Sequence, residues 1–259
     1  MDLELSGAAS IVTGAGGAIG RAAARALAVE GARVLLVGRG REALAATAAA
    51  CGPSAEVLAC DITRPGAAEE ITGACIERFG GIDVFVNCAG RTGFRPLGEL
   101  TEDDLDEQWQ LNVVALFRLL QIVAPHMAER GSGRIVSVAS VSGRRPSPSN
   151  AAYGSTKSAQ IALVRSFADT YAGRGVIVNS LLPGPVDTAM WRGVTGEAAT
   201  AAGVTFETLA EGTAAGLPRR QVGTADEIAS VIVFLASPLA ANVVGSAWTV
   251  DGGWTGQIF

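Results

Sequence analysis

The chain has 259 residues, of which 49% are hydrophobic and 17% charged, and its formal net charge is −5. This length and apolar content allow one large core, which favours a single domain. The acidic balance argues against a nucleic-acid partner, because such proteins carry a basic excess. No apolar run reaches the roughly 18 residues of a transmembrane helix, so no membrane partner is expected. The start, Met1 to Glu4, lacks the basic stretch of a signal peptide, and a cytoplasmic location is therefore expected.

Cysteine and histidine are too sparse for metal or hydrolase chemistry. Four cysteines occur, none in a C-x-x-C pair, and His126 is the only histidine. A zinc site needs more ligands than this, so no metal is predicted. The cysteines are expected to be free, mostly buried thiols in a reducing compartment. A Ser-His-Asp hydrolase would need His126 as its base, but its place near the end of a predicted helix favours a surface or packing role.

Short runs rich in β-branched residues alternate with Ala- and Leu-rich segments of helical length, such as 19–30 and 102–128. Strands that alternate with helices predict a parallel sheet covered on both faces. We therefore predict an α/β fold, a single doubly wound (Rossmann-type) domain over residues 1–259. Its seven parallel strands are expected at 10–12, 34–37, 57–59, 82–86, 135–138, 176–182 and 247–250. Ligands of such sheets bind beyond the carboxyl ends of the strands, so the residues after each run are the candidates.

A glycine-rich turn, Thr13 to Gly20, follows the first predicted strand and precedes a predicted helix. Glycines let the backbone approach a pyrophosphate, and the helix start offers free N–H groups and a partial positive charge. Such turns are common, but this position after the first strand is the one that a dinucleotide site requires. The candidate cofactor-binding residues of this turn are Gly14, Gly16, Gly17, Ile19 and Gly20.

No carboxylate follows the second predicted strand, where the sequence reads Gly38-Arg39-Gly40-Arg41. An acidic residue about 20 residues beyond the glycines would hold the ribose hydroxyls of NAD. Arg39 can instead form a charge-assisted fork to a 2′-phosphate, which favours NADP(H). Gly38 would also leave room for NAD(H), and Arg39 could simply be a solvated residue that opens a helix. Arg41, a little way into that helix, could add to the positive electrostatic field at the 2′-phosphate, or it could point to solvent.

Polar and small residues also follow the later strands. Asp61 could accept a hydrogen bond from an adenine amine, with Ile62 beside it, or it could cap the next helix. The residues after the fourth strand suit a backbone that lies against a cofactor, or else a tight turn. The fifth strand ends at Ser140. The remaining cofactor candidates follow the fourth and sixth strands: Asn87, Ala89, Gly90, Pro183, Gly184, Val186 and Thr188.

The only lysine of the chain, Lys157, follows Tyr153, one of two tyrosines, by four residues. On a helix, positions i and i+4 share a face. A free tyrosine has a pKa near ~10, too high for ready proton exchange at neutral pH, and a nearby ammonium lowers it. The ammonium also has three donors that can hold a sugar hydroxyl. A chance pair on a solvated helix face is the alternative, and the rest of the chain must decide between the two.

Taken in order, these motifs resemble those of the short-chain dehydrogenase/reductase family over residues 6–254. The family's glycine turn is matched with Ala18 in place of its middle glycine, and its N-N-A-G motif with Cys88 in place of the second asparagine. Both departures touch the packing of the cofactor loop and leave the proton-transfer residues intact. Val250 to Gly253 looks like the family's last strand end. The family's catalytic residues are matched by Asn112, Ser140, Tyr153 and Lys157, and its P-G-x-x-x-T motif by Pro183, Gly184 and Thr188.

The resemblance implies a hydride transfer between NADP(H) and a carbonyl or secondary alcohol, with the hydride chemistry supplied by the cofactor. Tyr153 would give or take the proton at the substrate oxygen, and Ser140 would hydrogen-bond that oxygen. Lys157 would lower the pKa of Tyr153 and hold the nicotinamide ribose. Asn112 would hold a water that links Lys157 to solvent, and Thr188 would bind the nicotinamide carboxamide.

Other functions remain open at this stage. The chain could be a 3-oxoacyl carrier-protein reductase or an NAD-dependent alicyclic alcohol dehydrogenase. From another class, it could be a non-catalytic nucleotide-binding regulator, although the full catalytic set argues against that. Arg130 and Arg174 could dock an acidic carrier protein or be ordinary surface arginines.

Substrate choice is expected in a long loop at about 189–217, where Met190, Trp191 and Phe206 are the large apolar members. The loop lacks a basic cluster, so a phosphate-rich substrate is not favoured. The resemblance also implies a homotetramer. Helices at 102–128 and 152–172 look like the family's dimer-forming pair. The apolar C-terminal part resembles its second interface and includes Trp248, Trp254 and Phe259.

Overall fold

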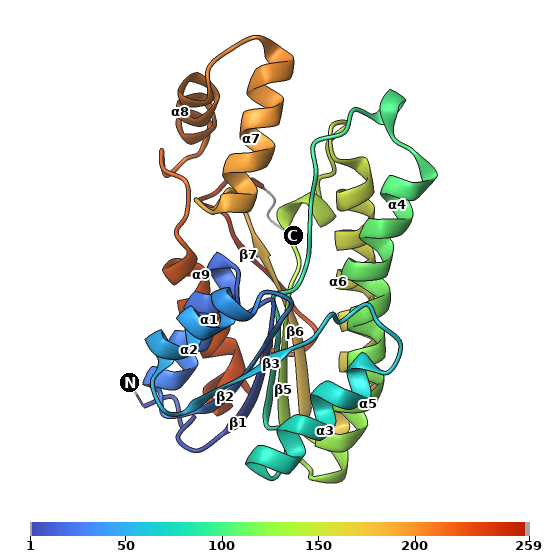
Figure 1. Cartoon of the computed structure of the whole chain (residues 1–259), viewed down its shortest axis with the longest axis vertical. Helices are drawn as coiled ribbons and strands as arrows, with labels where there is room; N and C mark the ends of the chain where they lie inside the picture. Colours follow the sequence, from blue (N-terminus) through green and yellow to red (C-terminus); the bar gives the residue numbers. More distant parts are fainter. Residues whose placement is uncertain (1, 257–259) are drawn as a thin grey trace.

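A computed structural model describes residues 2–256, and it contains one seven-stranded sheet in the order β3-β2-β1-β4-β5-β6-β7 (Figure 1). All neighbouring strands are parallel, which confirms the predicted doubly wound sheet. The order reverses between β1 and β4, so a ligand crevice is expected at the carboxyl ends of these two strands. The strands are β1 (Ala9–Thr13), β2 (Arg33–Gly38), β3 (Ala55–Ala59), β4 (Val84–Asn87), β5 (Gly133–Val138), β6 (Val176–Pro183) and β7 (Ala247–Val250).

Helices cover both faces of the sheet (Figure 1). One face carries α1 (Ala18–Val29), α2 (Arg41–Cys51) and α9 (Ala225–Ala236), and the other carries α3 (Ala67–Phe79), α5 (Ala115–Glu129) and α6 (Ala151–Tyr171). Side chains alternate along a strand, so neighbouring residues enter different cores. In β1, Ile11 packs in the core under α3, α5 and α6, whereas Val12 packs in the core under α1 and α9.

The helix predicted over 102–128 is interrupted. α4 (Glu102–Trp109) begins at a capping box between Thr101 and Asp104, and a π-helix (Gln110–Val114) then leads into α5. The π turn carries Asn112, and a widened turn of this kind is frequent at functional sites. Periodicity alone could not predict the interruption, because the apolar spacing continues through it.

The stretch Glu102–Glu129 is the one helical segment of residues 2–256 that is long and apolar enough to cross a membrane by length and composition. Much of its apolar surface is used inside the protein. Five of its large side chains are almost fully buried in the core that α5 shares with α3 and the sheet: Leu116, Leu119, Leu120, Val123 and Met127.

The prediction of a loop at about 189–217 is wrong, because most of this segment is helical. α7 (Ala189–Ala202) is capped by Thr188 and α8 (Phe206–Gly216) by Thr205. Between them Gly203 has φ +68°, which ends α7 in a left-handed turn. The rings of Trp191 and Phe206 pack edge to face at 6.0 Å and hold the two helices together.

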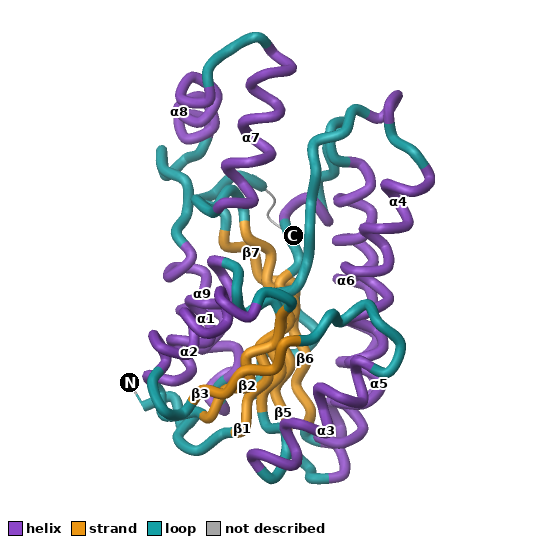
Figure 2. The backbone as a smooth tube through the Cα atoms, viewed as in Figure 1, coloured by secondary structure: helices purple, strands orange, loops and turns teal. Residues whose placement is uncertain are grey.

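The α7–α8 pair rises beyond the sheet, opposite the loop that leads from β4 to α4 (Figure 2). Glu197 of α7 reaches that loop, where its carboxylate accepts a hydrogen bond from the Phe94 N–H at 3.3 Å. The helical pair therefore closes one side of the space above the carboxyl ends of the strands. Short 3₁₀ turns complete the secondary structure at Leu97–Glu99, Val141–Gly143, Ala172–Arg174 and Pro238–Ala240.

Candidate active site

The glycine-rich turn after β1 is shaped by close backbone contacts that leave no room for side chains. Gly14 has φ +66°, and a Cβ added there would lie 2.7 Å from the Ala89 nitrogen. A Cβ at Gly20 would collide with the Gly14 carbonyl oxygen, and one at Gly16 would lie 3.1 Å from the Ala43 Cβ. Gly14 and Gly20 therefore bring the turn directly against the loop after β4 and against the start of α1.

The first turn of α1 is open for an anion. Gly17 is its N-cap and has no side chain to accept from the helix amides, and no acidic residue lies in that turn. Ile19 packs on the apolar core of this face and holds the helix in place. Free amides at a helix start, next to a glycine cradle, fit a pyrophosphate. The turn therefore offers free backbone donors and space that a dinucleotide would fit.

Arg39 follows β2 as an exposed residue. It makes no ion pair with any residue in the part of the chain that the structure describes. Gly40 is the N-cap of α2, so Arg39 lies just outside the helix and Arg41, also exposed, is its first residue. The guanidinium of Arg39 is therefore available to a ligand that lies against the end of β2.

Asp61 does not cap the next helix, so that alternative is wrong. Its Oδ1 accepts from the N–H of Thr63 at 2.9 Å and from the hydroxyl of Thr63 at 2.7 Å, whereas α3 is capped by Gly66. These hydrogen bonds lower the pKa of the Asp61 carboxyl, with a smaller contribution from Arg39. Ile62 is buried in the core under α3 and α5 and anchors this turn.

The residues after β4 lie between the glycine turn and the predicted catalytic groups. The Oδ1 of Asn87 accepts from the Thr13 hydroxyl at 2.8 Å, while its Nδ2 is buried without a partner. The Ala89 N–H donates to the same hydroxyl at 3.4 Å. A Cβ on Gly90 would lie 3.3 Å from Lys157 Nζ. A small residue is needed there because the ammonium lies directly behind the turn.

The four candidates at the end of β6 form the other wall. The Gly184 N–H donates to the Val250 carbonyl at 3.0 Å, and a Cβ on Gly184 would lie 2.6 Å from the Asp251 Cβ. Pro183 is the last residue of β6, and Val186 is buried and bridges to the strand-like segment at 223. The Thr188 hydroxyl accepts from the Trp191 N–H at 3.1 Å as the cap of α7, which leaves its own proton free to donate.

Ser140, Tyr153 and Lys157 meet at the carboxyl end of β5. Ser140 follows this strand, its Oγ accepts from the Ser142 N–H at 3.1 Å, and its side chain is close enough to Tyr153 to lower the pKa of the phenol. Tyr153 lies in the first turn of α6 and Lys157 in the next, with Nζ 5.5 Å from the centroid of the tyrosine ring. The structure thus brings together the three side chains that the sequence placed at separate points of the chain.

The sequence predicts that Lys157 lowers the pKa of Tyr153, but in the protein without a cofactor the effect of burial on this pKa is larger. Burial raises the pKa of Tyr153 to about 12, although the hydrogen bond from Ser140 opposes this. Burial also lowers the pKa of Lys157 to about 7, with an opposing contribution from Cys88. Exclusion of water penalises the charged forms of both side chains.

Asn112 is fully buried, and its side chain is held by protein groups. Its Nδ2 donates to the Thr156 hydroxyl at 2.9 Å and to the Arg91 carbonyl at 3.1 Å, and its Oδ1 accepts from the Arg91 N–H at 3.0 Å. The amide therefore ties the π turn to α6 and to the loop after β4. The side chain of the predicted catalytic asparagine thus connects three segments of the chain by hydrogen bonds.

Sequence reasoning missed Gln160. This side chain is fully buried, and its Oε1 accepts from Lys157 Nζ at 2.8 Å while its Nε2 donates to the Asn112 carbonyl at 2.5 Å. Lys157 also donates to the Val138 carbonyl at 3.0 Å. The sequence does contain a signal for this contact, because Gln160 follows Lys157 by three residues and so shares its helix face. A polar side chain on the inner face of a core helix needs a partner.

Cys88 remains a neutral thiol beside this cluster. Burial raises its pKa to about 12, although Lys157 opposes the rise. All four cysteines are free; Cys60 and Cys75 are buried and the other two partly buried. His126 has a buried Nε2 without a partner, as a packing residue of α5. Residues 2–256 contain no cluster of three or more His, Cys, Asp or Glu side chains that could hold a metal.

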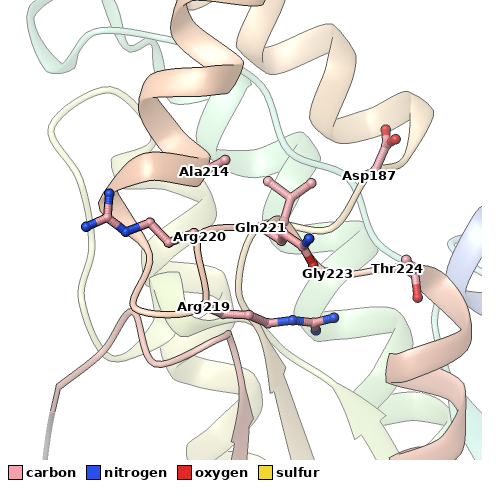
Figure 3. A pocket seen from close by; sticks show the side chains of 8 residues that line it. Asp187, Ala214, Arg219, Arg220, Gln221, Gly223 and Thr224 are labelled. Atoms are coloured by element: carbon pink, nitrogen blue, oxygen red, sulfur yellow. The ribbon is translucent and has the colours of Figure 1, made fainter.

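Two pockets are lined by segments that follow β5 and β6. One, of about 320 Å³, begins directly after Ser140 and is lined by the segment that leads to α6 and by Trp254 and Thr255. The other, of about 410 Å³, lies between the end of α8 and the start of α9 (Figure 3). In that view Asp187 and Thr224 lie on one side of it and Arg220 on the other. Arg220 has φ +60°, which marks a tight turn between the helical pair and α9.

A glycine cradle at the switch point of a doubly wound sheet, beside a Ser-Tyr-Lys cluster, defines a nicotinamide-nucleotide oxidoreductase. The comparisons with known proteins agree. A family model described as enoyl-(acyl carrier protein) reductase matches residues 14–255. The chain belongs to the short-chain dehydrogenase/reductase family and is an NAD(P)-dependent enzyme that acts on alcohols or ketones.

Among its relatives, the chain is 34% identical over 257 residues to a sorbitol dehydrogenase of Cereibacter sphaeroides, covering 97% of this chain and 98% of the relative. It is also 34% identical over 251 residues to a 3-oxoacyl-(acyl-carrier-protein) reductase of Vibrio cholerae, with 97% and 98% coverage. Among solved structures, it resembles L-sorbose reductase from Gluconobacter frateurii complexed with NADPH and L-sorbose. That match has a TM-score of 0.92 at 29% identity and covers 100% of both chains.

Proposed function

We propose that the protein is an NADP(H)-dependent oxidoreductase of carbonyl compounds and secondary alcohols, with Tyr153 as the proton donor or acceptor. The observation that carries this proposal is the convergence of Ser140, Tyr153 and Lys157 beside the glycine cradle, at the carboxyl ends of the strands. A binding module would need the cradle alone. The whole chain acts as one cofactor-binding and catalytic domain in this proposal.

The cradle holds the pyrophosphate, through the turn at Gly14 to Gly20 and the open start of α1. Arg39 pairs with the 2′-phosphate of the adenosine ribose, since its guanidinium has no competing ion pair within residues 2–256. Thr188 donates its free hydroxyl proton to the nicotinamide carboxamide. NADPH in the related L-sorbose reductase supports this choice. NAD(H) is the second candidate, because Gly38 leaves space beside an unphosphorylated ribose.

The bound nicotinamide supplies the hydride, and the protein handles the proton. Tyr153 donates its phenolic proton to the substrate oxygen during reduction and takes it back during oxidation. Its high pKa in the unliganded protein keeps that proton in place until a substrate oxygen accepts it. Ser140 donates to the same oxygen as charge develops there. Lys157 keeps one donor beyond its contacts with Val138 and Gln160, and that donor holds the nicotinamide ribose.

The substrate binds in the pocket that begins after Ser140. Ser142, Ser147, Asn150 and the charged Arg145 offer polar groups there, and Trp254 supplies an apolar wall. This lining suits a small polyhydroxylated ketone or alcohol, the kind of substrate named for the sorbitol and L-sorbose relatives. The α7–α8 pair bounds the opposite side and contributes to substrate choice.

A 3-oxoacyl carrier-protein reductase is the second candidate, supported by the relative of that name. The arginines suggested for carrier docking do not favour it. Arg130 and Arg174 precede β5 and β6, so they lie at the amino ends of the strands, away from the cradle. Arg130 also pairs with Asp83 at 3.4 Å, and Arg174 covers the Tyr171 ring at 5.6 Å.

The proposal includes a cytoplasmic homotetramer. The expected first interface, α4–α5 with α6, exposes Trp109 and Phe117, and the second exposes Trp248 and Trp254. Exposed large aromatic residues on two separate surfaces support two kinds of contact. The third residue expected in the second interface, Phe259, lies outside the described residues.

The test is turnover of a panel of ketones, ketoses and the matching alcohols with NADPH and NADH, by the wild type and by Tyr153→Phe. Proton catalysis of this type contributes ~10²-fold or more, so the variant should lose at least that factor in kcat. Its NADPH affinity, measured by protein fluorescence, should stay within a few-fold because the ring still packs. A variant that retains more than about a tenth of the wild-type kcat would show that Tyr153 is not the proton donor.

A further inference from the structure

Gln160 occupies the position between two predicted catalytic residues. The family resemblance predicts that Asn112 holds a water that links Lys157 to solvent; in the structure the carboxamide of Gln160 hydrogen-bonds both Lys157 Nζ and the Asn112 carbonyl. The two hydrogen bonds fix the orientation of this amide. An ammonium can donate only to Oε1, and a carbonyl oxygen can accept only from Nε2. The bridge is therefore directional, from Lys157 through Gln160 to the backbone of the π turn.

The bridge lies where water is excluded. Gln160, Asn112 and Thr156 are fully buried, and Lys157 is 3% exposed. The strand face opposite also carries polar groups: Asn87, Ser137 and Ser180 pair in register across β4, β5 and β6, on the face covered by α6. Asn87 Nδ2 and the two serine hydroxyls have no partner within residues 2–256, so none of them competes for Gln160. The amide is thus the one side-chain acceptor that the ammonium uses in the described part of the chain.

We propose that Gln160 is a positioning residue for Lys157: its carboxamide, anchored on the Asn112 carbonyl, keeps the buried ammonium charged and aims its remaining donor at the cofactor side. The other contact of Lys157, the Val138 carbonyl, belongs to the backbone and cannot be tuned by sequence. Gln160 is therefore the side chain through which this protein sets the charge state of its only lysine. The catalytic consequence rests on the proposed role of Lys157.

The charge balance explains why an amide acceptor matters. Burial lowers the pKa of Lys157 to about 7, and the neighbouring Cys88 opposes this shift. A hydrogen bond to an ionised donor is among the stronger ones, and its loss leaves a buried charge less stabilised. Without the Oε1 contact, the neutral amine would be favoured further. With a carboxylate in its place, the ammonium would be favoured more strongly.

The single lysine makes this directly measurable. In protein labelled with ¹³Cε-lysine, Lys157 gives the only lysine side-chain signal, because the sequence contains no other. Its chemical shift, followed against pH in the cofactor-free protein, reports the pKa of Lys157 without any enzymatic reaction. We expect Gln160→Met, nearly equal in size but without the amide, to lower this pKa by about one unit or more, a tenfold or larger change. We expect Gln160→Glu to raise it.

The matched control is Val164→Ala, one helical turn further along the same buried face of α6 and away from the cluster. It perturbs packing without removing a polar contact, and it should leave the pKa of Lys157 within a few tenths of a unit. If Gln160→Met does not fold, Gln160→Asn replaces it. This variant keeps an amide one methylene too short to bridge, and it should also lower the pKa. Thermal unfolding of each variant shows whether the fold is retained.

Opposite shifts in the methionine and glutamate variants support the proposal. An unchanged pKa in Gln160→Met, or an equal shift in Val164→Ala, overturns it. The alkaline limb of the kcat/KM–pH profile should move with the measured pKa, to lower pH in Gln160→Met and to higher pH in Gln160→Glu. If the lysine signal shifts but the kinetic limb does not, the bridge stands and the catalytic role proposed for Lys157 fails.

Discussion

The two faces of the sheet carry different side chains towards their carboxyl ends. Under α1 and α9, the inward residues stay apolar to the end of the strands, as Leu36, Val86, Val138 and Leu181 show. Under α3, α5 and α6, apolar residues such as Ile11 give way to a polar row in register, made of Thr13, Asn87, Ser137 and Ser180. Lys157, Gln160 and Asn112 come from the helices that cover this second face.

This difference separates two tasks. In the proposed function, the apolar face supports the glycine turn and Arg39, which hold the cofactor. The polar face carries the groups that transfer the proton, although burying polar groups there costs free energy. Four experiments test this division, from the largest expected effect to the smallest.

Replacing Lys157 tests the polar face most severely. Lys157→Arg keeps a positive charge, but the planar guanidinium is larger and cannot make the contacts of the compact ammonium with Val138, Gln160 and a ribose. We expect a loss of ~10²-fold or more in kcat/KM with NADPH. Arg165→Lys, an exposed swap on the same helix, is the control and should retain activity. Near-normal turnover by Lys157→Arg would mean that charge alone matters.

The stability of the two faces should respond differently to truncation. Leu36→Ala removes a fully buried side chain from the apolar face and should lower the free energy of unfolding by ~2–5 kcal/mol. Ser137→Ala removes a buried hydroxyl without a partner from the polar face and should change it by less than ~1 kcal/mol. Urea unfolding of both variants measures this. A loss above ~2 kcal/mol in Ser137→Ala would indicate that an ordered water binds this hydroxyl.

Cofactor choice should depend on the edge of the apolar face. Arg39→Ala removes the exposed guanidinium after β2, and a charged hydrogen bond of that kind contributes ~1.5–3 kcal/mol. We therefore expect the preference for NADPH over NADH to fall by about 10- to 100-fold in kcat/KM. The neighbouring Arg41→Ala is the control and should change it little. A wild-type preference for NADH, or equal effects of the two substitutions, would remove Arg39 as the phosphate contact.

A glycine-to-alanine substitution in the glycine-rich turn after β1 should weaken cofactor binding. In Gly20→Ala the new Cβ would collide with the Gly14 carbonyl, and relief of such overpacking costs ~1–3 kcal/mol. We expect weaker NADPH binding, by about tenfold or more, in a fluorescence titration. Gly73→Ala, inside α3 with no atom within 4 Å of the new methyl group, is the matched control and should be neutral or slightly stabilising. Unchanged affinity in Gly20→Ala would show that the turn does not form the cofactor contact.

The sheet was predictable because its signals are local. Each strand is a short apolar run, and the predicted and observed strands agree within a few residues at their ends. One local prediction failed and one local alternative was excluded, both for identifiable reasons. Residues 189–217 read as a loop because glycine and threonine are frequent, but Thr188 and Thr205 act as helix caps and make two helices. Asp61 could have capped the next helix, but its carboxylate instead accepts hydrogen bonds from the N–H and the hydroxyl of Thr63.

The amino-acid sequence by itself determined the parallel sheet, the glycine turn, the absence of a carboxylate after β2 and the spacing of Tyr153 and Lys157, because each is a property of neighbouring residues. Only the tertiary structure decided the electrostatics of the site. Burial raises the pKa of Tyr153 and lowers that of Lys157, against the direction that their spacing suggests. It also decided that Gln160 lies between Lys157 and Asn112, since a hydrogen bond across 48 residues depends on how α6 packs against the π turn.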